Sequence, residues 1–110
     1  MPTELSKKKC IPCEGGVPPL TKSEIRTLMQ QVKGWALSKD GWLVQEYEFE
    51  DFVGAKAFVD KVSELAEEEG HHPNIYIYSW NKLRLELYTH AINGLAESDF
   101  ILAAKINELK

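Results

Sequence analysis

The sequence predicts an α+β domain in which three helices cover one face of a four-stranded antiparallel sheet. Apolar residues recur with helical spacing in three segments. Two pairs of strand-like segments each enclose a turn signal, and these pairs alternate with the helical segments along the chain. The resulting order is helix, strand, strand, helix, strand, strand, helix, which gives a two-layer architecture.

The composition is that of an ordinary soluble globular protein. The 110 residues are 44% hydrophobic and 27% charged, and this length suits one core. We expect a polar leader over 1–20 and a single domain over 21–110. No apolar run approaches the ~20 residues that span a bilayer, and no secretory h-region follows the basic N-terminus. A net charge of −4 argues against a nucleic-acid partner.

The leader contains a lone Cys-x-x-Cys, formed by Cys10 and Cys13. A zinc ribbon would need a second such pair, and a thioredoxin-like site would need a preceding strand. Cysteines this close together cannot form the disulfide framework of a secreted domain. We therefore expect an unpaired thiol pair in a reducing, cytoplasmic compartment.

The first helix and the first hairpin follow from local signals. Thr21 and Glu24 have the spacing of a capping box, so a helix is predicted to begin here and to end at Gly34. Asp40-Gly41 then lies between two strand-like segments. It predicts a two-residue hairpin turn with positive φ at both positions.

The second half of the chain repeats this order. A long helix is predicted from Asp51, a candidate N-cap, to Gly70. The next two strands meet at Asn81-Lys82, since Asn tolerates the left-handed conformation. Leucines alternate with polar residues in the return strand, which places His90 at its end on the polar face. The last helix starts near Glu97. The two open edges of such a sheet favour a homo-oligomer.

Three histidines are expected at one corner of this fold. His71 and His72 follow the long helix, and His90 ends the strand that returns beside them. Glu67, one helical turn earlier, and Asp99, on the inward stripe of the last helix, can reach the same corner. Imidazole transfers protons near neutral pH, and a carboxylate can fix its tautomer. The residues therefore predict an acid–base site.

Other interpretations of these residues stay open. A His-His-Pro sequence at a helix end is often a cap and a turn, and His90 on a polar strand face is often simply exposed. Three histidines with Glu67 or Asp99 could also ligate zinc, as in a zinc hydrolase. The chain lacks the Cys/His spacing of a structural zinc site and a His-Glu-x-x-His helix, so we expect no metal.

A long ordered signature extends across the second hairpin. It consists of Glu67-Glu68-Glu69-Gly70-His71-His72-Pro73, Tyr76, Tyr78, Asn81-Lys82, Thr89-His90, Gly94-Leu95 and Asp99-Phe100. Over about residues 20–110 this resembles the pterin-4a-carbinolamine dehydratases. The leader around Cys10 and Cys13 resembles extensions of some bacterial and plant-type members. The family has the α+β fold predicted above and assembles by edge-to-edge sheet pairing into dimers or tetramers.

The resemblance implies dehydration of a 4a-hydroxytetrahydropterin to quinonoid dihydropterin and water during recycling of the tetrahydropterin. It implies no cofactor and no metal. The implied catalytic residues are His71, His72 and His90, supported by Glu67, Asp99 and Pro73. The implied substrate contacts are Ile75, Tyr76, Trp80 and Thr89. Expected partners are the pterin substrate, further copies of the chain in a homodimer or homotetramer, and a pterin-dependent hydroxylase.

The sequence departs from the animal-type members at three positions. Gly70 replaces an acidic residue before the histidine pair, Ile75 replaces an aromatic residue, and Ala96 replaces the Ser or Thr that caps the last helix. The main alternative function is a non-catalytic dimerisation or assembly partner on the same fold. Retention of all three histidines favours the enzyme.

Overall fold

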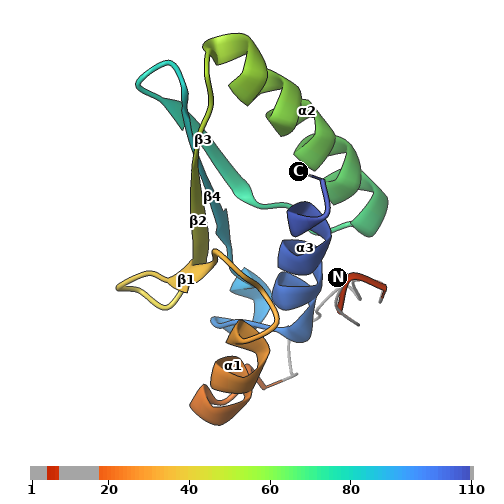
Figure 1. Ribbon diagram of the computed structural model, residues 1–110. Coiled ribbons are helices and arrows are strands. Elements are labelled where there is room, and N and C mark those ends of the chain that lie inside the picture. Colours follow the sequence, from red (N-terminus) through yellow and green to blue (C-terminus); the bar gives the residue numbers. More distant parts are fainter. Residues whose placement is uncertain (1–4, 8–17, 110) are drawn as a thin grey trace.

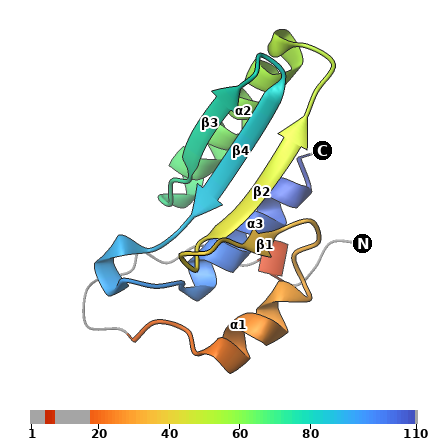
Figure 2. The ribbon, with the colours of Figure 1, turned by 90° about the vertical axis from the view of Figure 1, so that its left-hand side faces the viewer.

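A four-stranded antiparallel sheet and three helices form the two layers of the computed structural model, which describes residues 5–7 and 18–109 (Figure 1). The elements are α1 (Lys22–Met29), β1 (Ala36–Leu37), β2 (Leu43–Glu48), α2 (Phe52–Glu69), β3 (Asn74–Tyr78), β4 (Lys82–Leu87) and α3 (Glu97–Asn107), with 3₁₀ turns η1 (Leu5–Lys7) and η2 (His90–Ile92). The strand order is β1-β2-β4-β3. Helices α2 and α3 lie against one face, and α1 lies at the end of the sheet near β1 (Figure 2). The predicted fold class is confirmed.

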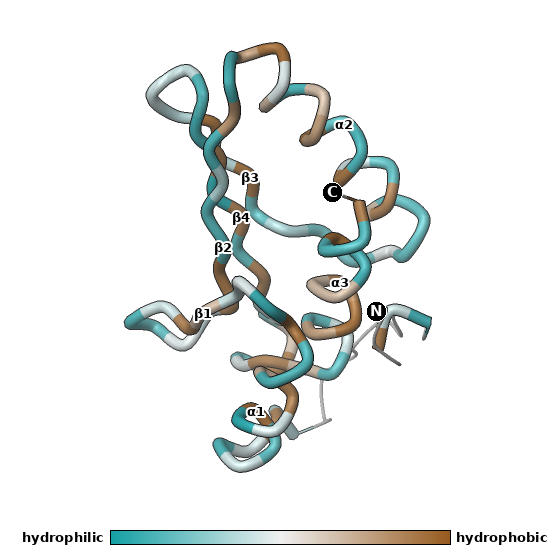
Figure 3. Tube along the Cα trace, viewed as in Figure 1, coloured by the Kyte–Doolittle hydropathy of each residue, from teal (hydrophilic) through white to brown (hydrophobic). Residues whose placement is uncertain are grey.

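Period-2 alternation separates the two faces of the sheet. Leu83, Leu85 and Leu87 of β4 are fully buried towards the helices, whereas Arg84 and Glu86 lie on the open face. Burial alternates in the same way along β3, whereas β2 departs from the alternation at Val44, which is buried beside Leu43. Figure 3 shows the hydropathy along the chain trace. The leucines that were predicted to face inward therefore form the sheet side of the hydrophobic core.

Helix α1 begins as predicted and ends earlier than predicted. The Thr21 N–H donates to Glu24 Oε1 at 2.9 Å, and the Glu24 N–H donates to Thr21 Oγ1 at 3.2 Å. These bonds confirm the capping box, and the backbone bond from Thr21 lowers the pKa of Glu24. The expected stop at Gly34 is wrong, because the helix ends at Met29. Turns replace the last helical residues and bring Val32 into the core.

The first hairpin has a three-residue loop in place of the predicted two-residue turn. The Gly41 N–H donates to the Ser38 carbonyl at 2.9 Å, and the Ser38 N–H donates to the Trp42 carbonyl at 2.8 Å. Gly41 has a φ of 83°, whereas Asp40 is not left-handed. A type I turn followed by one left-handed residue closes a loop of this length, so positive φ is needed once.

The second hairpin turns two residues earlier than predicted, at Ser79-Trp80 in place of Asn81-Lys82. Ser79 and Trp80 have φ values of 47° and 58°, and Asn81 is not left-handed. Asn81 instead joins the turn to the end of β2: its Nδ2 donates to the Phe49 carbonyl at 2.9 Å, and the Phe49 N–H donates to its carbonyl at 2.9 Å. These contacts between distant segments decide the turn, and local propensity does not reveal them.

The caps of the two long helices agree with the sequence. Asp51 accepts the Gly54 N–H at 2.7 Å at the start of α2, and Gly70 ends this helix in the left-handed conformation with a φ of 67°. Helix α3 starts at Glu97, and its N-cap residue Ala96 has no side chain that can accept a hydrogen bond. Asp99 compensates in part, since its Oδ2 accepts the Ala96 N–H at 2.9 Å.

We expect Ala96→Ser to raise the free energy of unfolding by about 1 kcal/mol. The serine hydroxyl would accept the N–H of Asp99, the third residue of α3, while the Asp99 carboxylate keeps its bond to the residue 96 N–H. Thermal unfolding followed by circular dichroism measures the change. An unchanged or lower melting temperature would show that residue 96 does not act as the N-cap.

Residues assigned to the leader also contact the domain. Leu5 of η1 is 2% exposed and belongs to the core cluster beside α3. The Leu20 N–H donates to the Leu95 carbonyl at 2.9 Å, and Pro19 passes so close to Gly94 that an added Cβ would lie 2.5 Å from it. Cys10 and Cys13 lie outside the described residues. Within residues 5–7 and 18–109, none of the helices has the length and apolar character required to cross a membrane.

Candidate active site

The buried carboxylate of Asp99 is bonded to several groups at the corner where the histidines were predicted. Asp99 is fully buried, and its Oδ1 lies 2.6 Å from His71 Nε2. Its other oxygen, Oδ2, accepts the Thr89 hydroxyl at 2.8 Å and the Ala96 N–H at 2.9 Å. The two oxygens therefore bind different groups, since Oδ1 contacts the histidine while Oδ2 contacts the loop and the start of α3.

Two helix ends bring this pair together. The left-handed Gly70 ends α2, and the next N–H, that of His71, still donates to the Ala66 carbonyl at 3.2 Å. His71 is thereby held at the end of α2 with most of its side chain buried. Asp99 lies in the first turn of α3 and points inward. In a neutral imidazole one ring nitrogen donates and the other accepts, so a His71 Nε2–H that donates to the carboxylate leaves Nδ1 as an acceptor.

The second histidine of the pair faces solvent. His72 Nε2 contacts Glu67 Oε2, and both side chains are exposed. Exposed ion pairs of this kind contribute little to stability, typically about 0–1 kcal/mol. Glu67 was expected to support the histidine cluster from one helical turn before His71, and the structure pairs it with His72.

His90 does not lie in a strand as predicted. Strand β4 ends at Leu87, and His90 begins η2 with an exposed side chain. The chain leaves the sheet because Thr89 and Gly94 form an isolated bridge that closes this loop. Thr89 then points inward to Asp99, and the next residue points outward.

The ring contacts of His90 are with two aromatic residues that sequence reasoning missed. Its ring meets Trp42 edge-on at a centroid distance of 5.5 Å and Tyr88 at 5.0 Å. Trp42 and Tyr88 are stacked at 4.8 Å. The register of the sheet explains the stack, because pairing of Leu43 with Leu87 places Trp42 and Tyr88 opposite each other. The ring of His90 therefore packs against the stacked pair of Trp42 and Tyr88.

The structure brings some predicted residues into direct contact and separates others. His71, Asp99 and Thr89 form one hydrogen-bonded unit. His72 and Glu67 form a neighbouring pair, and His90 lies with the aromatic residues. Among the residues that the structure describes, no group of three or more His, Cys, Asp or Glu side chains could hold a metal ion.

The four predicted substrate contacts lie in different places. Ile75 of β3 is half-buried against the core, and Tyr76 is 49% exposed on the opposite face of the same strand. Trp80 is 63% exposed in the β3–β4 turn, and Thr89 is 6% exposed. Pro73, which directly follows the histidine pair, is half-buried.

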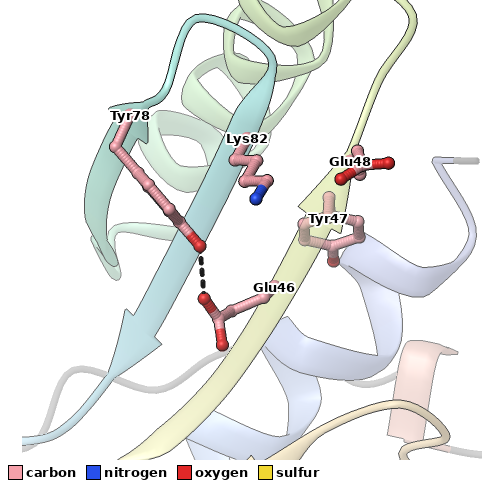
Figure 4. A pocket seen from close by; sticks show the side chains of 5 residues that line it. All are labelled: Glu46, Tyr47, Glu48, Tyr78 and Lys82. Carbon is pink, nitrogen blue, oxygen red and sulfur yellow. Dashed lines mark hydrogen bonds between the residues drawn. The ribbon is translucent and has the colours of Figure 1, made fainter.

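The open face of the sheet has a shallow hollow that contains none of the predicted site residues. It is lined by Glu46, Tyr47, Glu48, Tyr78 and Lys82 (Figure 4). The Tyr78 hydroxyl donates to Glu46 Oε1 at 2.5 Å, and this bond raises the pKa of Tyr78. The hollow is open and lies away from the Asp99–His71 pair, so we do not assign the chemistry to it.

Comparison with known proteins identifies the family. A family model described as pterin 4 alpha carbinolamine dehydratase matches residues 18–109. The chain belongs to this family. It is 53% identical over 105 residues to a relative from Rickettsia canadensis (strain McKiel) that carries the family's name, covering 94% of this chain and 95% of the relative. It is 42% identical over 111 residues to the mitochondrial pterin-4-alpha-carbinolamine dehydratase 2 of Arabidopsis thaliana, covering 97% of this chain and 59% of the plant protein.

Solved structures share this fold. A Brucella melitensis protein described as a transcriptional coactivator/pterin dehydratase matches with a TM-score of 0.77 and 29% identity, over 83% of this chain and 97% of that one. A pterin dehydratase-like RuBisCO assembly factor of the alpha-carboxysome matches with a TM-score of 0.56 and 28% identity, over 69% of this chain and 88% of that one. The family places this protein among the hydro-lyases, with a pterin as its substrate.

Proposed function

We propose that the protein dehydrates a 4a-hydroxytetrahydropterin to quinonoid dihydropterin and water by histidine acid–base catalysis, in recycling of the tetrahydropterin. The single observation that supports this most strongly is the fully buried Asp99, whose Oδ1 lies 2.6 Å from His71 Nε2. A histidine held in this way has a defined tautomer and a free ring nitrogen, as a general base requires.

The reaction needs one proton delivered and one removed. The substrate carries a hydroxyl on C4a beside N5–H, and expulsion of water requires protonation of that hydroxyl and loss of the N5 proton. Electrons stay within the pterin, so the step consumes no redox cofactor. We assign the base to Nδ1 of His71 and the acid to His72, which contacts Glu67.

His90 and the predicted contacts Ile75, Tyr76 and Trp80 would bind and orient the substrate. The edge-on contacts with Trp42 and Tyr88 hold the ring of His90, which we assign to the C4a hydroxyl. Pro73 restrains the backbone after the histidine pair. The exposed Trp80 offers a flat aromatic face for a planar pterin, and we keep Ile75 and Tyr76 as further contacts.

We further propose a homodimer or homotetramer that forms through β3. This strand is an outer strand of the sheet, five residues long, and carries exposed Tyr76 and Tyr78. Such an edge offers unpaired backbone groups to a second chain. We also propose a cytoplasmic protein that receives its substrate from a pterin-dependent hydroxylase.

The test is stopped-flow ultraviolet absorbance of 4a-hydroxytetrahydropterin decay. Wild-type protein should accelerate the decay. His71→Ala should lower the acceleration at least about tenfold, as loss of an acid–base group does, and His90→Ala should lower it as much, because the C4a hydroxyl is no longer oriented. A wild-type protein that does not exceed the spontaneous rate would reject the proposal. It would favour the alternative, a non-catalytic dimerisation or assembly partner that has kept the histidines.

A further inference from the structure

The Thr89 side chain makes a buried hydrogen bond that substrate binding does not explain. Its side chain is 6% exposed, and its hydroxyl donates to Asp99 Oδ2 at 2.8 Å. The second oxygen of the same carboxylate holds His71 Nε2 at 2.6 Å. We propose that Thr89 is a positioning residue, whose hydroxyl orients Asp99 so that Oδ1 stays on His71. The expected effect on turnover rests on the proposed function, whereas the orienting of Asp99 by Thr89 does not.

The hydroxyl is not required to hold the loop in which Thr89 lies. The Thr89 N–H donates to the Gly94 carbonyl at 3.0 Å, and the Gly94 N–H donates back to the Thr89 carbonyl at 3.4 Å. The same carbonyl accepts the Ile92 N–H at 3.3 Å. Backbone hydrogen bonds therefore hold the loop, and the side-chain hydroxyl is left to orient the Asp99 carboxylate.

The start of α3 does not need this hydroxyl either. The Ala96 N–H is satisfied by Asp99 Oδ2 at 2.9 Å, from within the same helix turn. This one bond fixes an oxygen but not the plane of the carboxylate, because the terminal torsion of an aspartate is broad. The Thr89 hydroxyl arrives on Oδ2 from the loop after β4, and two donors from different segments define the plane. Oδ1 is then directed at His71.

Burial makes the bond irreplaceable by water. Asp99 is fully buried and Thr89 nearly so. In such surroundings an unmade hydrogen bond to a carboxylate is costly, and the carboxylate would turn towards other donors. The Nε2–H tautomer of His71 would then no longer be enforced, and Nδ1 would serve less well as the base.

Thr89→Val and Thr89→Ser separate this role from a structural one. Valine keeps the shape and removes the hydroxyl, whereas serine keeps the hydroxyl. We expect kcat to fall about tenfold in Thr89→Val, the size of one hydrogen bond to a charged group, with KM within about twofold. Thr89→Ser should keep most of the wild-type kcat. Imidazole ¹⁵N shifts should report the Nε2–H tautomer of His71 in wild type and Thr89→Ser and its loss in Thr89→Val.

The readouts give distinct outcomes. A Thr89→Val protein with wild-type kcat and an unchanged His71 tautomer would overturn the proposal, and so would a raised KM with unchanged kcat, which would place Thr89 on the substrate. If wild type does not accelerate the dehydration, the proposed function fails, and the ¹⁵N shifts still decide whether Thr89 orients Asp99. Near-ultraviolet circular dichroism checks the fold. Should Thr89→Val not fold, Thr89→Ala removes the same hydroxyl with less bulk.

Discussion

Asp99→Asn is expected to lower turnover by about 10²–10⁴-fold while the protein stays folded. The amide oxygen can still accept the hydrogen bonds of Thr89 and Ala96, so the amide NH₂ is directed at His71. An NH₂ group requires an acceptor there, which moves the ring hydrogen of His71 from Nε2 to Nδ1. The proposed base is then blocked. Stopped-flow absorbance gives kcat, and thermal unfolding reports the fold.

Asp99→Ala is expected to lose activity and stability together. It leaves His71, the Thr89 hydroxyl and the Ala96 N–H without their buried partner, at a cost of about 3–5 kcal/mol in the free energy of unfolding. The matched control is Asp60→Asn on the exposed surface of α2, which should change neither property. Wild-type turnover in Asp99→Asn would contradict the assigned role of the carboxylate.

Phe100→Ala is expected to destabilise the protein by about 3–5 kcal/mol. Phe100 is 0% exposed and has the largest side chain among the fully buried residues, so its removal leaves a cavity against α3 and the sheet. This is a large fraction of the roughly 5–15 kcal/mol that stabilises a typical domain. Equilibrium unfolding in urea measures the loss, at one fixed protein concentration because an oligomer gains stability with concentration.

The control for this prediction is the same substitution on the surface. Phe52 begins α2 and is 51% exposed, so Phe52→Ala should change the free energy of unfolding by no more than about 0.5 kcal/mol. Similar losses in the two variants would mean that Phe100 is not a core residue, and the packing of α3 on the sheet would have to be revised.

Signals confined to a few neighbouring residues predicted the elements well. The caps at Thr21, Asp51 and Gly70 depend on bonds between residues three or four positions apart, which the sequence displays. Two of the wrong boundaries depend on contacts between distant segments. Burial of Val32 shortens α1, and the pairing of Asn81 with Phe49 shifts the second turn.

The sequence predicted which residues gather at one corner of the fold, but it did not predict which of them are hydrogen-bonded to each other. The inward stripe of the last helix was enough to place Asp99 near His71, although they are 28 positions apart. Which carboxylate serves which histidine depends on side-chain directions at the two helix ends, and periodicity does not resolve these. Glu67 accordingly pairs with His72, and His90 rests on Trp42 and Tyr88.

Asp99 has a structural and a chemical role at once, because its Oδ2 accepts bonds from Thr89 and Ala96 while its Oδ1 contacts His71. A lineage that abandoned the reaction could exchange His72 and His90 at little thermodynamic cost, since both side chains are exposed. It could not exchange Asp99 so freely, because the buried N–H of Ala96 and the hydroxyl of Thr89 would lose their acceptor. Drift away from catalysis should therefore remove these two exposed imidazoles first and leave the buried carboxylate in place.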